Sequence, residues 1–297
     1  DSLACTEPVL VSRDDVIYKR IDPEYSDGCV WARYINMLNI TNEYDFIYQV
    51  DSHMLHDMNW DRALIEDYKR AMDMCETNKV IITGSCKSFV IQEKDGEIKT
   101  YPCHEENDAC QVKYYTIDPD TLIPDVHGDN IPSTDMPRPA FHIMAGNFFT
   151  HVDWIDNVGL DPKIFFVGEE IMMTMMSYAA GYKMFHHSKM VSYHLENTSN
   201  WHTKTPPEDQ KAARRREILA EIGRWQWKHY LEACREDLLS EFHQEFGVDF
   251  INLDIEERAR TYSLDVLPGK VDVLAISKKP KKKVKLPKTL FMSEDEE

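Results

Sequence analysis

The sequence predicts an α/β fold, in which a mixed sheet of Rossmann type is flanked by helices. Residues 44–50 are rich in aromatic and β-branched residues, which favour strands, and this run ends in the polar triplet Asp51-Ser52-His53. Residues 60–78 carry apolar side chains near helical spacing, and 80–84 returns as a strand. An order of strand, helix and strand is typical of α/β sheets, whose ligands gather at the C-terminal ends of the strands.

The same patterns predict the remaining elements. We expect a helix at 30–38, strands at 16–20, 141–150 and 164–167, and a Met-rich helix at 171–180 that the Gly181-Tyr182 pair ends. The methionines of that helix are expected to pack in the core rather than to form a binding surface. Residues 84–139 contain many prolines and are expected to be irregular, apart from a hairpin around Lys94-Asp95-Gly96.

Changes of composition divide the chain into three parts. We expect a catalytic α/β part at 1–207, a charged helical extension at 208–267 and a tail at 268–297. The tail is basic from Lys278 to Lys288 and acidic at its end, and its proline-broken composition predicts disorder.

The bulk composition excludes several classes of function. Forty-two per cent apolar residues in a chain of 297 provide for a sizeable core. Lys and Arg number 34 against 52 Asp and Glu, which gives a formal charge of −18 and makes nucleic acid an unfavourable partner. No apolar run is long enough to span a bilayer.

The cysteines favour a reducing compartment. There are seven of them, an odd number with no C-x-x-C pair, so we expect a cytoplasmic location and thiols rather than a disulfide scaffold. Pairing of Cys103 with Cys110 is the alternative. The chain starts at Asp1 without a methionine, which leaves a lost signal or anchor open.

The Asp51-Ser52-His53 triplet is the candidate metal site. Side chains two apart in an extended chain point the same way, so a carboxylate oxygen of Asp51 and an imidazole nitrogen of His53 can share one divalent ion. This mixed donor set suits Mn²⁺. The alternative is an ordinary pair of turn and capping residues, and the triplet needs support from elsewhere in the chain.

An ordered series of short motifs supplies that support, because it resembles the family-60 glycosyltransferases, and within them the Skp1-type polypeptide N-acetylglucosaminyltransferases. The matching segments are Gly28, Ala32-Arg33, Asp51-Ser52-His53-Met54, Trp60-Asp61, Ala145-Gly146-Asn147-Phe148, Gly168-Glu169-Glu170-Ile171, Gly181-Tyr182 and Tyr193-His194. The family's first nucleotide-binding strand has no counterpart among the 31 residues before Ala32, so we expect that strand to lie outside this chain.

The resemblance implies a GT-A-like fold, a UDP-sugar donor carrying N-acetylglucosamine, and retention of anomeric configuration. It also implies Mn²⁺ or Mg²⁺ as cofactor, and a hydroxyl on a protein or glycan as acceptor. His194 is the implied third metal ligand, with His186 and His187 as competitors. Residues implied in donor binding are Arg33, Asp51, Trp60, Asp61 and Gly146.

The implied catalytic acids are Glu169 and Glu170, and we favour a role in orienting the acceptor over a covalent nucleophile. At a helix start, consecutive side chains diverge by about 100°, so we expect only one of them to face the donor. We assign that role to Glu170 and expect the other to cap the helix or to face solvent.

Two other classes of protein compete with this interpretation. A non-haem iron oxygenase also uses two His and one carboxylate, but it usually has them in His-x-Asp order on a barrel of short strands. A non-catalytic carbohydrate-binding protein of the same fold would use the same aromatic and acidic residues without turnover.

Overall fold

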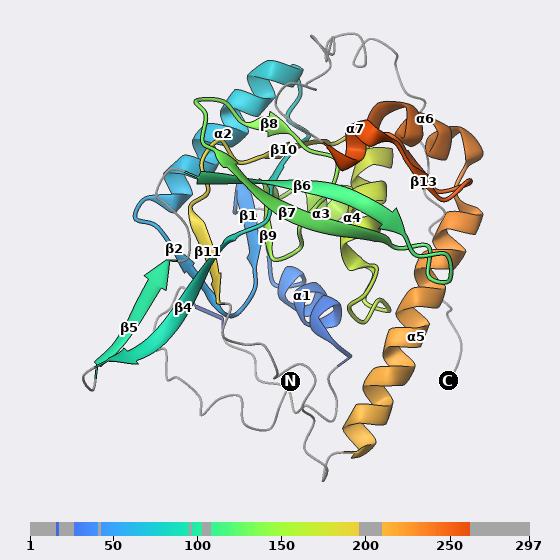
Figure 1. Ribbon diagram of the computed structural model, residues 1–297, viewed down its shortest axis with the longest axis horizontal. Helices are drawn as coiled ribbons and strands as arrows, with labels where there is room; N and C mark the ends of the chain where they lie inside the picture. The colour runs from blue at the N-terminus through green and yellow to red at the C-terminus, as the bar shows by residue number, and fades with distance from the viewer. Residues whose placement is uncertain are drawn as a thin grey trace.

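The computed structural model describes residues 16–17, 27–40, 43–94, 97–102, 108–195 and 210–261. Its centre is a five-stranded sheet with the order β1-β9-β3-β10-β8 (Figure 1). β3 and β10 run parallel and the other pairs are antiparallel, so the expected mixed α/β class is confirmed. The strands of this sheet are β1 (Phe46–Val50), β3 (Val80–Thr83), β8 (Arg138–Pro139), β9 (Asn147–His151) and β10 (Lys183–His186).

Alternate side chains of this sheet enter two separate cores. In β3, Ile81 belongs to one buried cluster, whereas Val80 and Ile82 belong to the other, as the two-residue period of a strand requires. α2 (Trp60–Cys75) covers one face and α4 (Glu169–Ala179) belongs to the cluster on the other. The Met-rich stripe of α4 is buried, as predicted, and α2 ends three residues early because Glu76 takes a left-handed conformation with φ 51°.

A second sheet has the order β2-β11-β4-β5. It consists of β2 (Met54–His56), β4 (Lys87–Lys94), β5 (Glu97–Pro102) and β11 (Ser192–Leu195). Lys94 pairs with Glu97 across β4 and β5, which confirms the expected hairpin. The chain passes from β1 of the central sheet to β2 of this sheet through residues 51–53, so the predicted metal triplet lies where the two sheets join.

The expectation that residues 84–139 are irregular is wrong. Besides β4 and β5, this region forms a long antiparallel hairpin of β6 (Asp108–Ile117) and β7 (Pro124–Pro132), which Figure 1 shows in green. Its prolines do not interrupt the ladder, because Pro124 and Pro132 are the first and last residues of β7 and Pro119 lies between the strands. Proline is tolerated at strand ends, so a count of prolines misjudged this region.

Two further strands differ from the prediction. Within 141–150, strand structure begins only at Asn147, and 164–167 forms no strand. Phe166 is 60% exposed, and the segment lies against α5 rather than in a sheet, since a Cβ added at Gly223 would come 3.1 Å from Phe165 N. The apolar character of 164–167 therefore serves contacts with a helix.

The helical C-terminal region is confirmed and shares the core of the α4 face. It comprises α5 (Gln210–Ala233), α6 (Glu236–Phe246), β12 (Val248–Asp249), β13 (Asp254–Ile255) and α7 (Glu257–Arg260). Trp227 of α5 and Phe242 of α6 are fully buried in that cluster. None of the described helices is long and apolar enough to cross a bilayer. Most of the strand expected at 16–20, Cys103, and the predicted tail lie outside the described residues.

Helices α1 (Cys29–Met37) and α3 (Trp154–Asn157) complete the fold. α1 begins after Gly28, whose φ of 102° is one that side chains rarely adopt. A Cβ on Gly28 would lie 2.4 Å from Phe165 Cδ2, so the start of α1 is pressed against the segment that leads into α4. This contact brings Arg33 of α1 toward the glutamates of α4.

Candidate active site

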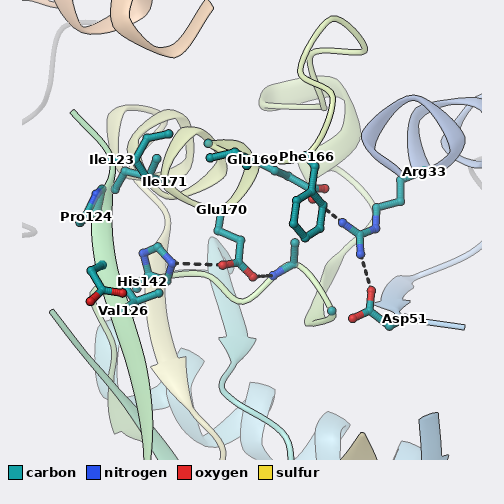
Figure 2. Close-up of a pocket in the computed structure, with 15 residues that line it drawn as sticks. Arg33, Asp51, Ile123, Pro124, Val126, His142, Phe166, Glu169, Glu170 and Ile171 are labelled. Carbon is teal, nitrogen blue, oxygen red and sulfur yellow. Dashed lines mark hydrogen bonds and ion pairs between the residues drawn. The ribbon is translucent and has the colours of Figure 1, made fainter. Parts of the chain in front are cut away.

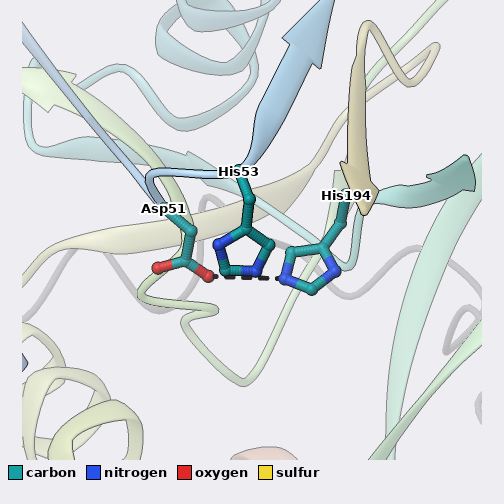
Figure 3. Close-up of side chains that lie close together, drawn as sticks. All are labelled: Asp51, His53 and His194. Carbon is teal, nitrogen blue, oxygen red and sulfur yellow. Dashed lines mark ion pairs between the residues drawn. The ribbon is translucent and has the colours of Figure 1, made fainter. Parts of the chain in front are cut away.

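Asp51, His53 and His194 converge at the junction of the two sheets (Figure 3). One ligand atom from each lies within 4.8 Å of the others. Asp51 Oδ2 is 3.8 Å from His194 Nε2, and the two imidazole rings are 4.3 Å apart. The structure thus brings together the three residues that the sequence placed around a metal ion.

Strand pairing fixes this convergence. Asp51 follows directly after β1, and His53 directly precedes β2. His194 pairs with Met54 across β11 and β2, and the N–H of Leu195 donates to the carbonyl of His53 at 3.1 Å. The ladder therefore holds the two histidines next to each other before any ion binds.

The donor chemistry of the group fits a divalent cation. One carboxylate oxygen and two imidazole nitrogens form a set that first-row divalent metals accept. Each of the three residues is half-buried, so water or phosphate oxygens can reach the remaining coordination positions. His186 and His187 are not part of this group: they are buried, and burial lowers the pKa of His186 to about 4 and that of His187 to about 3.

Gly146 leaves the space in which the Asp51 carboxylate lies. A Cβ added at Gly146 would lie 2.5 Å from Asp51 Oδ2, closer than van der Waals contact permits. Val50 pairs with Asn147 across β1 and β9, so the residues that flank this pair, Asp51 and Gly146, face each other at the end of the ladder. The role of Gly146 is therefore steric, which the short Ala-Gly-Asn-Phe motif did not reveal.

Arg33 joins Asp51 to Glu169 (Figure 2). Its Nη2 donates to Asp51 Oδ1 at 2.5 Å, and its Nη1 donates to Glu169 Oε2. Asp51 thus uses one oxygen toward Arg33 and the other toward His194. Arg33, which the resemblance implied in donor binding, contacts two carboxylates in this structure.

The two glutamates have different surroundings, because Glu169 is buried and Glu170 is half-buried beside the cavity. Glu169 is 3% exposed, and burial raises its pKa to about 7 although the Arg33 guanidinium opposes the shift. Glu170 is 32% exposed and accepts a hydrogen bond from the Ala145 N–H at 2.8 Å. The residue before α4 is Gly168, and no side chain caps this helix. The expectation that one glutamate caps the helix or faces solvent is therefore wrong.

A cavity of about 480 Å³ opens beside the metal group, a size within the range of small-molecule sites. One end of its lining is charged and carries Arg33, Asp51 and Glu169, and Glu170 lies farther along (Figure 2). The other end is largely apolar. It carries Ile123, Pro124, Val126, His142 and Ile171, and the charged Asp125 between Pro124 and Val126 also lines the cavity.

The residues of the apolar end were not predicted from the sequence. Ile123, Pro124 and Val126 belong to the β6–β7 hairpin, in a region that was expected to be irregular. His142 stands alone between apolar residues and carries no motif. Only knowledge of the hairpin pairing would have placed them near the glutamates.

Trp60 and Asp61 do not line this cavity. The Trp60 ring packs against Tyr48 at 5.1 Å and His56 at 5.3 Å, and Asp61 is exposed in the first turn of α2. The structure therefore places Trp60 and Asp61 beside the core on the α2 face rather than beside the glutamates, and their part in donor binding stays a prediction.

The donor set alone matches both a glycosyltransferase and an iron oxygenase, since each accepts two His and one carboxylate. The architecture differs from the oxygenase expectation, because helices flank a mixed sheet whereas that class has a barrel of short strands. Similarity to known proteins bears separately on the choice between a glycosyltransferase and an iron oxygenase.

A family model described as "Glycosyltransferase (GlcNAc)" matches residues 4–250, well over half of the chain. No curated protein matches. Among solved structures, the chain is similar to that of GalNAc-T7 with UDP, GalNAc and Mn²⁺, at 14% identity and a TM-score of 0.45. This similarity covers 74% of the chain and 42% of the GalNAc-T7 chain, so the present chain spans less than half of that protein. By the family match, the chain belongs to the GlcNAc glycosyltransferase family.

Proposed function

We propose that this protein is a divalent-metal-dependent glycosyltransferase that moves N-acetylglucosamine from UDP-N-acetylglucosamine to an acceptor hydroxyl, with retention of configuration. The observation that carries the proposal is the Asp51, His53 and His194 group beside a cavity that contains two glutamates and an arginine. The family match supports the transferred sugar, since its description specifies GlcNAc.

Asp51, His53 and His194 would hold Mn²⁺ or Mg²⁺. Neutralisation of the charge that develops on the diphosphate leaving group is the chemistry that such a cation supplies. Asp51 is kept in place by Arg33 and by the space at Gly146. These contacts fix the carboxylate before the donor arrives, which reduces the reorganisation that binding requires.

The charged end of the cavity suits the hydroxyls of a sugar. Arg33 and Glu169 provide donors and acceptors there, and Glu170 lies between this end and the apolar wall. We assign Glu170 to orientation of the acceptor hydroxyl, because it is the more exposed of the two glutamates and is not paired with Arg33. A protein side chain or a glycan would carry that hydroxyl.

A screen of UDP-sugars with and without Mn²⁺ tests the proposal. Hydrolysis of UDP-N-acetylglucosamine that depends on the cation and exceeds that of UDP-glucose is the expected result. A protein that binds UDP-sugars but hydrolyses none with any added acceptor would be the non-catalytic carbohydrate-binding alternative. Metal-dependent consumption of 2-oxoglutarate would instead support the iron oxygenase.

A further inference from the structure

A line of side chains extends from Glu170 into the protein interior. His142 Nε2 lies 3.6 Å from Glu170 Oε2, and His142 Nδ1 lies 2.7 Å from Tyr114 Oη. Figure 2 shows the His142 ring directed at the Glu170 carboxylate. His142 is 2% exposed and lines the apolar end of the cavity, and Tyr114 is fully buried behind it.

The position of the protons on this line follows from its geometry. Burial, with the charge of Glu170 as a smaller cause, raises the pKa of Tyr114 well above its usual value, so its hydroxyl keeps the proton. That O–H can donate to His142 Nδ1 or to the Phe141 carbonyl at 3.2 Å. In the first case His142 is neutral and its proton is on Nε2. In the second, Nδ1 donates to Tyr114.

In the second case a neutral His142 would point the Nε2 lone pair at a carboxylate, an arrangement of two acceptors without a proton. That arrangement is unfavourable. The first arrangement, with its proton on Nε2 directed at Glu170, is therefore the favoured one. Nε2 is buried and has no hydrogen-bond partner among the described residues, and the Glu170 carboxylate lies 3.6 Å from it.

We propose that His142 is a positioning residue for Glu170, held by Tyr114, and that its Nε2–H orients the Glu170 carboxylate so that Oε2 is presented to the cavity. The proposal rests on the proposed function, in which Glu170 orients an acceptor hydroxyl. Glu170 Oε1 already accepts from the Ala145 N–H, so both carboxylate oxygens face fixed N–H groups while Oε2 retains a lone pair for the substrate.

The β6–β7 hairpin connects the line of Glu170, His142 and Tyr114 to the apolar end of the cavity. Tyr114 of β6 pairs in register with Val126 of β7, and Val126 lines the cavity. One strand pair thus carries both the residue that holds His142 and a residue that contacts the substrate. The position of Glu170 is thereby tied to the shape of the site in which the acceptor would lie.

Two substitutions at position 142 separate positioning from packing. In His142→Gln, the side-chain amide can place an N–H near the position of Nε2, whereas His142→Leu fills the space without a donor. If His142 acts by positioning, kcat for metal-dependent hydrolysis of UDP-N-acetylglucosamine falls by about tenfold to a hundredfold in His142→Leu and much less in His142→Gln. If His142 only packs, the apolar Leu is tolerated as well as Gln or better.

Two further measurements complete the test. Mn²⁺ affinity remains unchanged, since no proposed ligand is altered. The control His229→Gln, at an exposed position on α5, keeps wild-type kcat.

The state of the imidazole is measured without any activity. In the resting protein, ¹⁵N NMR of the ring, assigned by its absence in His142→Gln, is expected to show a proton on Nε2. A neutral ring protonated on Nδ1, or Leu equal to Gln in kcat, overturns the proposal. Wild-type protein that hydrolyses no UDP-sugar contradicts the proposed function instead, and the NMR result still decides where the proton lies.

Discussion

The two ends of the cavity are built in different ways. The charged end is made by residues that lie at the ends of strands and at the starts of helices, close to short motifs such as Asp51-Ser52-His53 and Gly168-Glu169-Glu170. The apolar end is made by a hairpin whose two strands pair over more than twenty residues of sequence. The first end gathers charged groups beside the candidate metal ligands, and the second is mostly apolar, so substitutions at the two ends should affect different kinetic quantities.

The largest effect is expected from the metal residues. Asp51→Ala and His53→Ala each remove a donor from the group of three, and turnover should fall by about a thousandfold. Mn²⁺ binding, followed by electron paramagnetic resonance, should be lost in both variants while circular dichroism stays unchanged. Wild-type turnover by either variant with Mn²⁺ present would remove the metal assignment.

A smaller but still large effect is expected from Gly146→Ala, which tests the charged end without removing any charge. The added methyl group would lie 2.5 Å from Asp51 Oδ2, so the carboxylate must move. A displacement on this scale costs turnover about a hundredfold and weakens Mn²⁺ binding. The matched control is Gly181→Ala, where a Cβ meets nothing within 4 Å; φ is 85° there, so it costs stability but not Mn²⁺ affinity. Equal Mn²⁺ affinities for wild type and Gly146→Ala would contradict this account.

At the apolar end, Val126→Thr keeps the shape of the side chain and adds a hydroxyl. Because Val126 is only half-buried, the KM of the substrate that contacts it should rise by only about fivefold. Mn²⁺ affinity should not change. Whether the KM of the donor or that of the acceptor rises tells which substrate occupies this end, and a change in Mn²⁺ binding would mean that the two ends are not separate.

The smallest effect concerns stability. Burial raises the pKa of Glu169 to about 7 from an ordinary value of 4.5, so between these pH values the folded protein holds a proton that the unfolded chain has lost. This contribution to stability is full below the ordinary pKa and is lost as the pH rises through the folded value. Thermal unfolding of wild type and Glu169→Gln between pH 5 and 8 should show a shallower pH dependence in the variant. If wild type and Glu169→Gln show the same pH dependence of unfolding temperature, the group that titrates in this range is not Glu169.

The contrast between the charged end and the apolar end also shows which parts of the molecule could be predicted from the sequence. The position of Asp51 and His53 after a strand follows from local composition, and the approach of His194 followed from a resemblance in the order of motifs. The hairpin could not be predicted in this way, because the pairing of Tyr114 with Val126 depends on two strands whose prolines suggested a loop. His142 was missed for the same reason, since its partners come from β6 and α4 and from no neighbour in the sequence.

Segment 164–167 is a second case in which the prediction from sequence was wrong. Its run of apolar residues predicted a strand, and its true environment is the surface of α5 near Gly223. A short apolar run cannot by itself distinguish burial in a sheet from contact with a helix. The two glutamates that follow nevertheless lie in the first turn of a helix, because Gly168 and the helix after it did not depend on that strand.

The close approach of Gly28 to Phe165 makes the start of α1 sensitive to substitution. Gly28 carries no side chain that could bind a substrate, yet any other residue there must both adopt a rare backbone conformation and displace Phe165. Either adjustment would shift α1, and with it the guanidinium that joins Asp51 to Glu169. In a survey of random substitutions, position 28 should therefore rank among the inactivating positions beside Arg33, although Gly28 has no side chain.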